Sequence, residues 1–184
     1  MKREIDHFVV AARTLDEGAA WIESRLGVAP VAGGKHVTMG THNRLVSLGP
    51  DLYLEVIAVD PDAAPPQRPR WFELDTAAMR ERIARSPELI HWAERTDDLE
   101  AALVDYPVAV DIVPFERGAY RWRMALTRDG SLPAGGAFPT LIQWEGARPT
   151  AALPDSGIRL ERFTREGGIL RASFSTTSGT RTIP

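Results

Sequence analysis

The sequence predicts an α+β fold made of two related halves, each with the element order β, α, β, β, β. Three observations carry this prediction: a strand followed by a capped helix near the start, a proline-rich segment after residue 60, and the return of the first pattern from residue 88. A chain of 184 residues suits one domain. Its expected parts are a first module (1–60), a linker with a helix (61–87), a second module (88–146) and C-terminal strands (147–184).

The first half opens with a strand at residues 5–11, where β-favouring side chains follow one another. A helix then starts at Thr14, because Thr14 and Glu17 form a capping box that satisfies free backbone N–H groups of the first turn. Apolar residues follow at helical spacing until Gly27, a typical helix stop. Three strands are expected next, at residues 36–39, 44–48 and 52–59.

The second half repeats this pattern after the linker. Prolines between residues 60 and 70 disfavour regular structure, and a helix is expected at residues 76–85, before Pro87. The segment from Glu88 to Ala93 matches the one from Glu4 to Val9 in type and order. Such self-similarity indicates an internal duplication. The further expected elements are a helix from about residue 97 to Pro107, strands at 109–115, 120–127 and 140–145, and two or three strands after 157 that extend or cover a sheet.

Composition excludes several classes of protein. The formal net charge is −3, and no basic stripe with interleaved aromatic residues suggests a nucleic-acid surface. There is no cysteine, so disulfides, thiolate metal sites and cysteine nucleophiles are excluded. No apolar run approaches the roughly 20 residues that a membrane-spanning helix needs. We therefore expect a cytoplasmic protein without nucleic-acid or membrane partners.

Four polar residues occupy matching places in the two halves. His7 and His91 lie early in matching strands, and Glu55 and Gln143 lie in the last strand of each half. A polar group on an apolar sheet face needs a partner, because burying it alone costs several kcal/mol. Imidazole, carboxylate and amide groups together suit a divalent Fe, Mn, Ni or Zn ion. The alternative is structural: hydrogen-bonded histidines, Glu55 paired with an arginine, and Gln143 bonded to backbone.

Two other groups of residues could take part in chemistry. Glu145 shares a strand face with Gln143 and could be a ligand, a catalytic base or a rim charge beside Trp144. The glycine-rich segment 33–44 offers a donor-rich edge suited to a carboxylate, enolate or phosphate; its polar residues are His36, Thr41, Asn43 and Arg44. The alternative for that segment is a tight hairpin whose polar side chains cap turns. The glycine-rich loop at residues 130–136 could cover a site, and the tryptophans are expected in the core or in a pocket wall.

Several of these motifs resemble the glyoxalase-like branch of the vicinal oxygen chelate superfamily. The segments that carry the resemblance are Ile5-Asp6-His7-Phe8-Val9-Val10, Gly33-Gly34-Lys35-His36, Gly40-Thr41-His42-Asn43-Arg44-Leu45, Tyr53-Leu54-Glu55-Val56-Ile57 and Leu141-Ile142-Gln143-Trp144-Glu145. The resemblance implies paired βαβββ modules that form a curved mixed sheet, as in glyoxalases, bleomycin-resistance proteins and dioxygenases. It also implies a cleft for a divalent metal, with ligand positions at His7, Glu55, His91 and Gln143, and it suggests a homodimer.

The sequence therefore favours a divalent-metal-dependent enzyme of lyase, isomerase or dioxygenase type that acts on a small oxygenated metabolite. Glu55 or Glu145 would move a proton. The residues expected to hold the substrate are His36, Thr41, Asn43, Arg44 and Trp144. The alternatives are a metal-free protein of the same fold that binds or sequesters small molecules, as drug-resistance proteins do, and a protein whose role is interaction.

Overall fold

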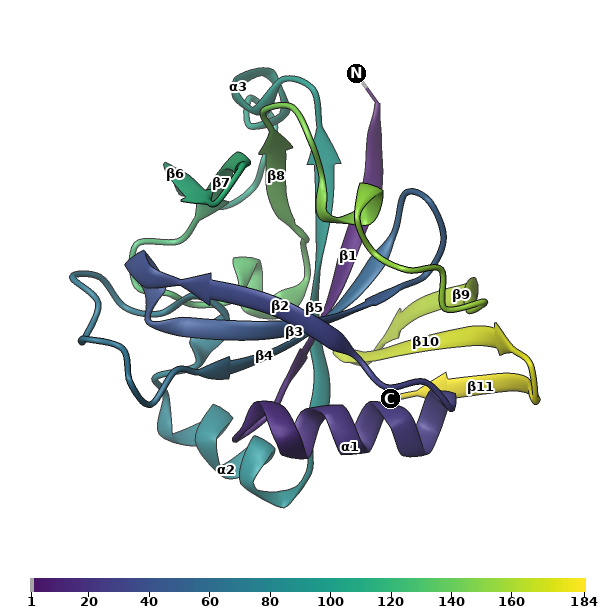
Figure 1. The fold of residues 1–184 in the computed structure, drawn as a ribbon. Helices are drawn as coiled ribbons and strands as arrows, with labels where there is room; N and C mark the ends of the chain where they lie inside the picture. Colours follow the sequence, from purple (N-terminus) through teal and green to yellow (C-terminus); the bar gives the residue numbers. More distant parts are fainter. Residues whose placement is uncertain (1) are drawn as a thin grey trace.

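The computed structural model describes residues 2–184 and shows two similar halves joined in one curved sheet (Figure 1). The first half comprises β1 (Arg3–Ala11), α1 (Leu15–Leu26), β2 (Val31–His36), β3 (Thr41–Ser47) and β4 (Tyr53–Val59). The second half comprises β5 (Glu88–Thr96), α3 (Leu99–Ala102), β6 (Asp111–Arg117), β7 (Tyr120–Leu126) and β8 (Thr140–Trp144). Helix α2 (Ala77–Arg85) lies between the halves along the chain.

The eight strands form one mixed sheet in the order β2-β3-β4-β1-β5-β8-β7-β6. Strands β1 and β5 pair antiparallel at its centre, and each pairs in parallel with the last strand of its own half, β4 or β8. The halves are therefore related by a pseudo-twofold arrangement about the centre. The sheet curls into a half-barrel, and the predicted fold class of paired βαβββ modules in a curved mixed sheet is confirmed.

Local sequence signals place the first helix as expected. The Thr14 side chain accepts a hydrogen bond from Glu17 N (3.2 Å), and Gly27 ends α1 in the left-handed conformation (φ 78°). Two expectations were wrong. Residues 37–39 form a 3-10 turn instead of a strand, since the chain must reverse between β2 and β3. Helix α3 ends at Ala102, and the chain then turns so that the Tyr106 hydroxyl donates to Pro139 O (2.6 Å).

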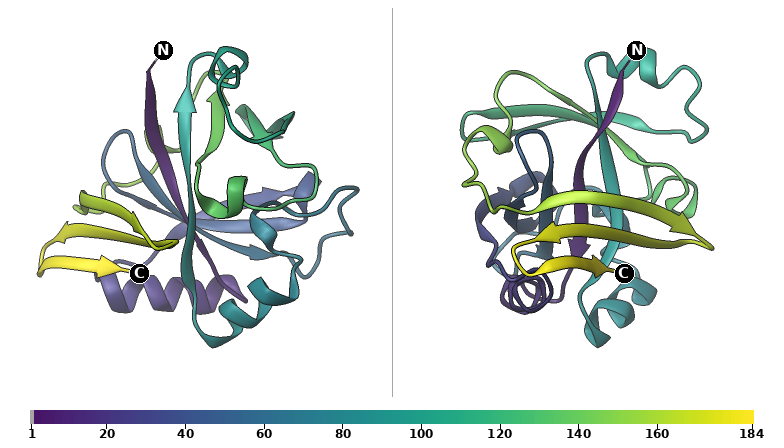
Figure 2. Two further views of the ribbon diagram at one scale, coloured as in Figure 1. Left: turned by 180° about the vertical axis from the view of Figure 1, so that it is seen from behind. Right: turned by 90° about the vertical axis from the view of Figure 1, so that its right-hand side faces the viewer.

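The convex face of the sheet is covered by α1 and by a separate three-stranded sheet. This sheet has the order β11-β10-β9 and is formed by β9 (Arg159–Glu166), β10 (Ile169–Thr176) and β11 (Gly179–Ile183). Phe8, Ile22 and Phe174 are fully buried in the core between these elements. Figure 2 shows the small sheet stacked beside α1 on the same side of the central strands. The C-terminal strands therefore cover the main sheet, as the sequence predicts.

The concave face holds a second core and the residues that concern function. Helix α2 packs there through Met79 and Ile83, next to the short turn Trp71–Glu73. Trp71 and Phe72 are buried against side chains of the second half such as Met124. No helix in residues 2–184 has the length and apolar character to cross a membrane.

Strand β1 carries a β-bulge at Asp6. In the pairing with β5, Ile5 lies opposite Glu94 and His7 lies opposite Ala93, so that Asp6 is an extra residue. A bulge bends a strand and re-aims the neighbouring side chains. Consequently the side chains of Asp6 and His7, adjacent in the chain, come together at the concave face, where alternation would otherwise separate them.

Candidate functional site

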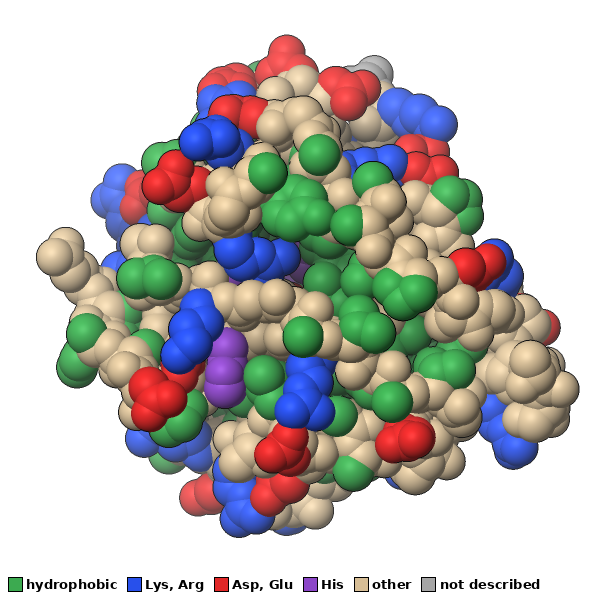
Figure 3. Space-filling model, in the orientation of Figure 1, with side chains coloured by type: hydrophobic (Ala, Val, Ile, Leu, Met, Phe, Trp, Pro, Cys, Tyr) green, Lys and Arg blue, Asp and Glu red, His purple; other side chains and the backbone are tan. Residues whose placement is uncertain are grey.

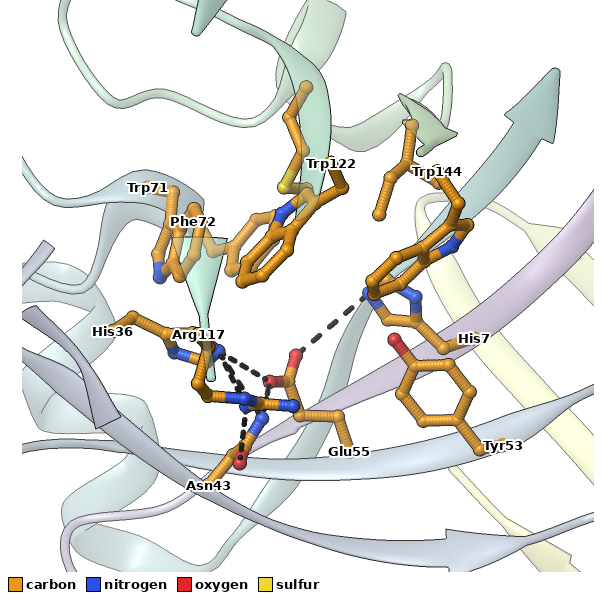
Figure 4. A pocket seen from close by; sticks show the side chains of 12 residues that line it. His7, His36, Asn43, Tyr53, Glu55, Trp71, Phe72, Arg117, Trp122 and Trp144 are labelled. Carbon is orange, nitrogen blue, oxygen red and sulfur yellow. Dashed lines mark hydrogen bonds and ion pairs between the residues drawn. The ribbon is translucent and has the colours of Figure 1, made fainter. Parts of the chain in front are cut away.

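A pocket that is partly open to solvent lies on the concave face, and its enclosed part, the space that a water molecule could enter, is about 20 Å³. Its polar side comes from the first half, apart from Arg117, and its apolar side mainly from the second (Figure 4). The lining residues are His7, His36, Asn43, Tyr53, Glu55, Trp71, Phe72, Arg117, Trp122, Met124, Ile142 and Trp144. The cavity thus places one carboxylate and two histidines opposite a wall of tryptophans.

Glu55 lies at the centre of the polar side. It projects from β4 and is 5% exposed, and its Oε1 accepts a hydrogen bond from Asn43 Nδ2 (2.6 Å). Its other oxygen, Oε2, lies 3.9 Å from His7 Nε2, and no hydrogen bond from residues 2–184 reaches it. Asn43 therefore fixes the orientation of the carboxylate and leaves one of its oxygens available for a ligand.

His7 is held in one orientation by Asp6. The His7 Nδ1 atom lies 2.7 Å from Asp6 Oδ1, and the second Asp6 oxygen accepts a hydrogen bond from Trp144 Nε1 (3.0 Å). Nδ1 therefore carries its proton, and Nε2 is the atom that can exchange a proton with the cavity. Below the His7 ring, Tyr53 stacks at 4.7 Å. Burial, together with the carboxylates of Asp6 and Glu55, raises the pKa of the Tyr53 hydroxyl well above its usual value.

His36 is neutral. Its Nδ1 lies 3.1 Å from Thr41 Oγ1, and its Nε2 accepts a hydrogen bond from Arg117 Nη1 (3.3 Å). Burial lowers the pKa of His36 to about 4, with Glu55 acting in the opposite direction and Arg117 adding to the decrease. The Nδ1 proton thus points to Thr41, and the Nε2 lone pair is already engaged by a cationic donor.

Arg117 crosses from one edge of the sheet to the other. It ends β6, and its Nη1 donates to Asn43 Oδ1 (3.2 Å) on β3 and to His36 at the end of β2, the opposite edge strand (Figure 4). A Cβ atom on Gly34 would lie 2.6 Å from Arg117 Cδ, so glycine gives the guanidinium stem its path. No ion pair joins Arg117 to a carboxylate of residues 2–184. Figure 3 shows a Lys or Arg side chain across a hollow with histidine surface beneath it.

His91, the counterpart of His7, faces a different environment. Its Nε2 accepts from Thr140 N (3.1 Å) and lies 3.0 Å from Thr140 Oγ1. Burial, with a smaller effect of His7, lowers the pKa of His91 to about 3. Its Nδ1 is buried with no partner among residues 2–184. The strand pairing explains the contact with Thr140: Glu55 lies opposite Val9, two residues after His7, and Thr140 lies opposite Ala93, two residues after His91.

The structure does not bring the remaining predicted residues to the cavity wall. Gln143 points to the start of α3, where its Oε1 accepts from Leu99 N (2.9 Å) and its Nε2 donates to Asp97 O (2.9 Å). Glu145 is half exposed and lies 3.9 Å from Arg123. Arg44 pairs with Asp16 on the surface (2.5 Å). Thr41 reaches the site only through His36.

These positions allow a test of whether the residues suit the divalent metal that the resemblance implies. The His91 lone pair is directed to Thr140, and Gln143 lies on the other face of its strand. A cation beside His36 would meet the Arg117 guanidinium. No group of three or more His, Asp and Glu side chains in residues 2–184 is placed to hold a metal ion. Only His7 and Glu55 keep free donor atoms, so the set does not fit a catalytic metal with three protein ligands.

Sequence reasoning missed Arg117, which lines the cavity, and Asp6, which holds His7 in place from behind. Arg117 stands in no motif, and only closure of the curved sheet brings β6 close to β2. Asp6 adjoins His7, yet strict alternation along a strand places it on the opposite face; the bulge changes this. The sequence predicts tryptophans in the core or in a pocket wall, and Trp122 and Trp144 do line the cavity.

The curled sheet of paired modules around a polar cavity defines an enzyme-like fold of the vicinal oxygen chelate superfamily. A family model described as "Glyoxalase-like domain" matches residues 5–167, and the chain belongs to this family. No curated protein matches the chain.

Solved structures share this fold at low sequence identity. A hypothetical protein from Staphylococcus aureus is 16% identical, with a TM-score of 0.57 over 96% of this chain and 82% of that chain. A methylmalonyl-CoA epimerase in complex with methylmalonyl-CoA and NH4+ is 17% identical, with a TM-score of 0.51 over 79% of this chain and 97% of that chain. The methylmalonyl-CoA epimerase of Streptomyces coelicolor is 17% identical, with a TM-score of 0.50 over 79% and 96%. At these identities the likeness establishes the fold.

Proposed function

We propose that this protein is an enzyme of lyase or isomerase type that moves a proton on a carbon next to a carbonyl group of a small, anionic, oxygenated metabolite. One observation carries the proposal: Glu55 is buried with one oxygen fixed by Asn43, and its other oxygen lies 3.9 Å from the Nε2 atom of His7. A carboxylate and an imidazole so placed can act as acid and base on one small molecule between them.

The chemistry follows from the free atoms of these two groups. Glu55 Oε2 removes the proton from the carbon, and the electron pair of the C–H bond moves to the carbonyl oxygen and gives an enolate. For this step His7 must start with a proton on both ring nitrogens, a cation that Asp6 stabilises. His7 Nε2 then gives its proton to the enolate carbon or oxygen and the imidazole becomes neutral, while Glu55 holds the proton that it removed; exchange of both protons with solvent restores the starting form. Tyr53 keeps its hydroxyl proton and shields His7 from water. Proton transfer by such positioned groups contributes about 10²–10⁴-fold in rate.

Arg117 supports an anionic substrate. Among the lining side chains of the described chain it alone carries a permanent positive charge, and its hydrogen bonds to Asn43 and His36 go to neutral acceptors. A guanidinium without a carboxylate partner binds a carboxylate or enolate well, because it offers paired donors. The wall that includes Trp122 and Trp144 excludes water and so strengthens this attraction.

The proposal does not use a divalent metal, in contrast to the hypothesis from sequence. The proposed steps need only Glu55, His7 and Arg117, and the donor set around them does not match a three-ligand site. If Fe, Mn, Ni or Zn were added to metal-stripped protein, elemental analysis should find no stoichiometric ion that is lost in His7→Ala. One tightly bound ion per chain, lost in that variant, would restore the metal-dependent hypothesis.

The experiment that tests the function is deuterium exchange at carbon. The wild type is incubated in D2O with a panel of small 2-oxo and 3-oxo acids, and NMR follows loss of the proton next to the carbonyl. We expect enzyme-dependent exchange for members of the panel, reduced about 10²–10⁴-fold in Glu55→Gln. The matched control is Glu161→Gln. Glu161 is exposed on β9, a strand of the separate C-terminal sheet, so this variant should catalyse exchange as the wild type does.

A second candidate, a metal-free protein that binds or sequesters small molecules, is favoured by the aromatic wall. Trp122 stacks on Phe115 (5.6 Å) and lies 5.3 Å from Trp144, and such surfaces grip planar ligands. Saturable binding of panel members without any deuterium exchange would support this candidate and refute the enzyme.

A further inference from the structure

An open groove lies at the end of the main sheet where β5 starts, and it shares no lining residue with the candidate functional site. Its walls come from α1, the end of α2, the start of β5 and the hairpin that joins β9 to β10. The space in the groove that a water-sized molecule can enter is about 620 Å³, against about 20 Å³ in the candidate site. Sites for small molecules commonly measure about 300–1,000 Å³, so the groove has room for such a ligand.

The floor of the groove is apolar. Leu89, Ile90 and Leu170 line it and are 2%, 4% and 5% exposed. Two larger surfaces beside them stay accessible, since Ile169 is 54% exposed and the Trp21 ring is half-buried. Binding sites for small molecules combine such an apolar floor with a few polar groups that orient the ligand. A ligand that fits this floor has an apolar body.

The polar groups of the groove are mainly cations. Arg82 pairs with Glu88, whereas Arg25 and Arg85 form no ion pair with any carboxylate of residues 2–184. The lining side chains therefore have an excess of two positive charges, on a chain whose formal net charge is −3. A concave surface with an excess of one sign of charge raises the local concentration of ligands of the opposite sign. The ligand that complements this groove is an anion.

Stabilisation of helix ends explains these two arginines only in part. Both lie in the last turn of a helix, where a cation interacts favourably with the helix dipole. Arg85 does so through Nε, which donates to Glu81 O (3.3 Å), and its two Nη groups remain for another partner. The Arg25 guanidinium instead lies over the Trp21 ring, 4.6 Å from the centroid. Stacking on a ring holds the guanidinium in place and leaves the N–H groups at its edge for an acceptor.

We propose that this groove binds a small molecule with an apolar body and a carboxylate group. The apolar body lies on the floor formed by residues such as Leu89 and Leu170, and the carboxylate accepts hydrogen bonds from Arg25 and Arg85. A guanidinium suits a carboxylate because it offers paired donors to the two oxygens. The site goes beyond the proposed function, since it needs neither Glu55 nor His7.

The test uses 2-naphthoate as the probe and 2-naphthamide, which has the same apolar body without the charge, as its matched control. NMR spectra of the whole protein at constant ionic strength follow the indole N–H signal of Trp21, assigned with Trp21→Phe. We expect a saturable shift with 2-naphthoate, because its rings would lie beside the Trp21 ring. The dissociation constant of 2-naphthamide should be about tenfold higher, because the amide has no charge for the arginines to bind.

Variants of the arginines test their part in binding. Arg25→Gln and Arg85→Gln should each raise the dissociation constant of 2-naphthoate about fivefold, the effect expected when one exposed charge pair is lost. Arg80→Gln is the matched control: it removes the same charge from an exposed position on α2, and Arg80 does not line the groove. This variant should bind 2-naphthoate as the wild type does.

Three results would overturn the proposal. Equal affinity for 2-naphthoate and 2-naphthamide would show that the groove recognises no anion. A dissociation constant that stays unchanged in both Arg25→Gln and Arg85→Gln would show that neither arginine takes part. Shifts confined to the signals of Trp122 and Trp144 would place the probe in the candidate functional site. A Trp21 shift that persists in Glu55→Gln, while deuterium exchange is lost, supports both proposals; failure of one result alone identifies which proposal is wrong.

Discussion

The two halves of the sheet share a topology but contribute opposite chemistry to the cavity. The first half supplies polar groups, with Glu55 facing His7 across 3.9 Å. At the matching positions of the second half, His91 is bonded to Thr140 and withdrawn into the core, and the cavity is lined instead by residues such as Trp122 and Trp144. Under the proposed function, the first half supplies the acid and the base, and the second half supplies the aromatic wall that excludes water together with Arg117, which binds the anion.

The largest expected effect is a difference in deuterium-exchange rate between variants at two equivalent positions, Glu55 of the first half and Thr140 of the second. Glu55→Gln should lower the deuterium-exchange rate about 10²–10⁴-fold, because it removes the base. Thr140→Val should leave the rate within about threefold, because the Thr140 hydroxyl bonds to His91, which the proposed steps do not use, and the Thr140 N–H still bonds to the ring. Rates are measured at saturating substrate. A comparable loss in Thr140→Val would mean that the second half takes part in the chemistry.

The next effect concerns stability and the buried histidines of both halves. The pKa values of His36 (about 4) and His91 (about 3) lie below the usual 6.5, because burial disfavours the charged ring. The unfolded chain therefore binds these protons first, and stability is full above pH 6.5 and is lost as the pH falls towards 4. The loss should be on the order of 1 kcal/mol per histidine for each pH unit.

Urea unfolding at pH 7.5, 6.5, 5.5 and 4.5 measures this loss. His36→Gln should reduce the slope between pH 6.5 and 4.5, since one of the two titrating groups is removed. An unchanged slope in the variant would show that His36 accepts a proton in the folded protein as readily as in the unfolded chain.

A smaller effect, on substrate binding, is expected for Arg117, which extends from the second half to Asn43 and His36 of the first. Arg117→Gln should raise KM about tenfold with little change in kcat, because the anion loses a charged partner while Glu55 and His7 stay in place. Arg117→Lys should recover part of the affinity through its charge. Steady-state kinetics with an accepted substrate of the exchange panel would separate the two parameters, and a fall in kcat alone would contradict a role in binding.

The smallest effect distinguishes Gln143 from the residues of the cavity. Gln143→Ala should lower the free energy of unfolding by about 1 kcal/mol, because its amide caps the start of α3 through Leu99 N and Asp97 O. Exchange rate and metal content should match those of the wild type. Loss of a bound ion in this variant would return Gln143 to the role of a metal ligand.

Local sequence patterns predict much of the fold, but they predict only part of the candidate site. Capping at Thr14, the stop at Gly27 and the repeated strand pattern are local signals, and they define elements and order well. His7 and Glu55 are conspicuous as polar residues in apolar strands, and His36 and Asn43 stand in the donor-rich, glycine-rich segment 33–44, so the sequence indicates all four. Local sequence and spacing align Gln143 with Glu55, but strand pairing places Thr140 at that position. Register depends on long-range pairing, which a single sequence does not encode locally.

The crossing of Arg117 between the two outermost strands has a consequence for the behaviour of the protein in a crowded solution. Unpaired sheet edges invite strands of other chains, and long flat edges promote aggregation. Here β6 carries Pro114, which has no N–H to offer, and the pairing of β2 with β3 is irregular between Ala32 and Lys35. With the guanidinium drawn across the gap, neither edge presents a regular template. Arg117, the residue proposed to bind the anion, therefore also lies where the two edges of the sheet approach each other.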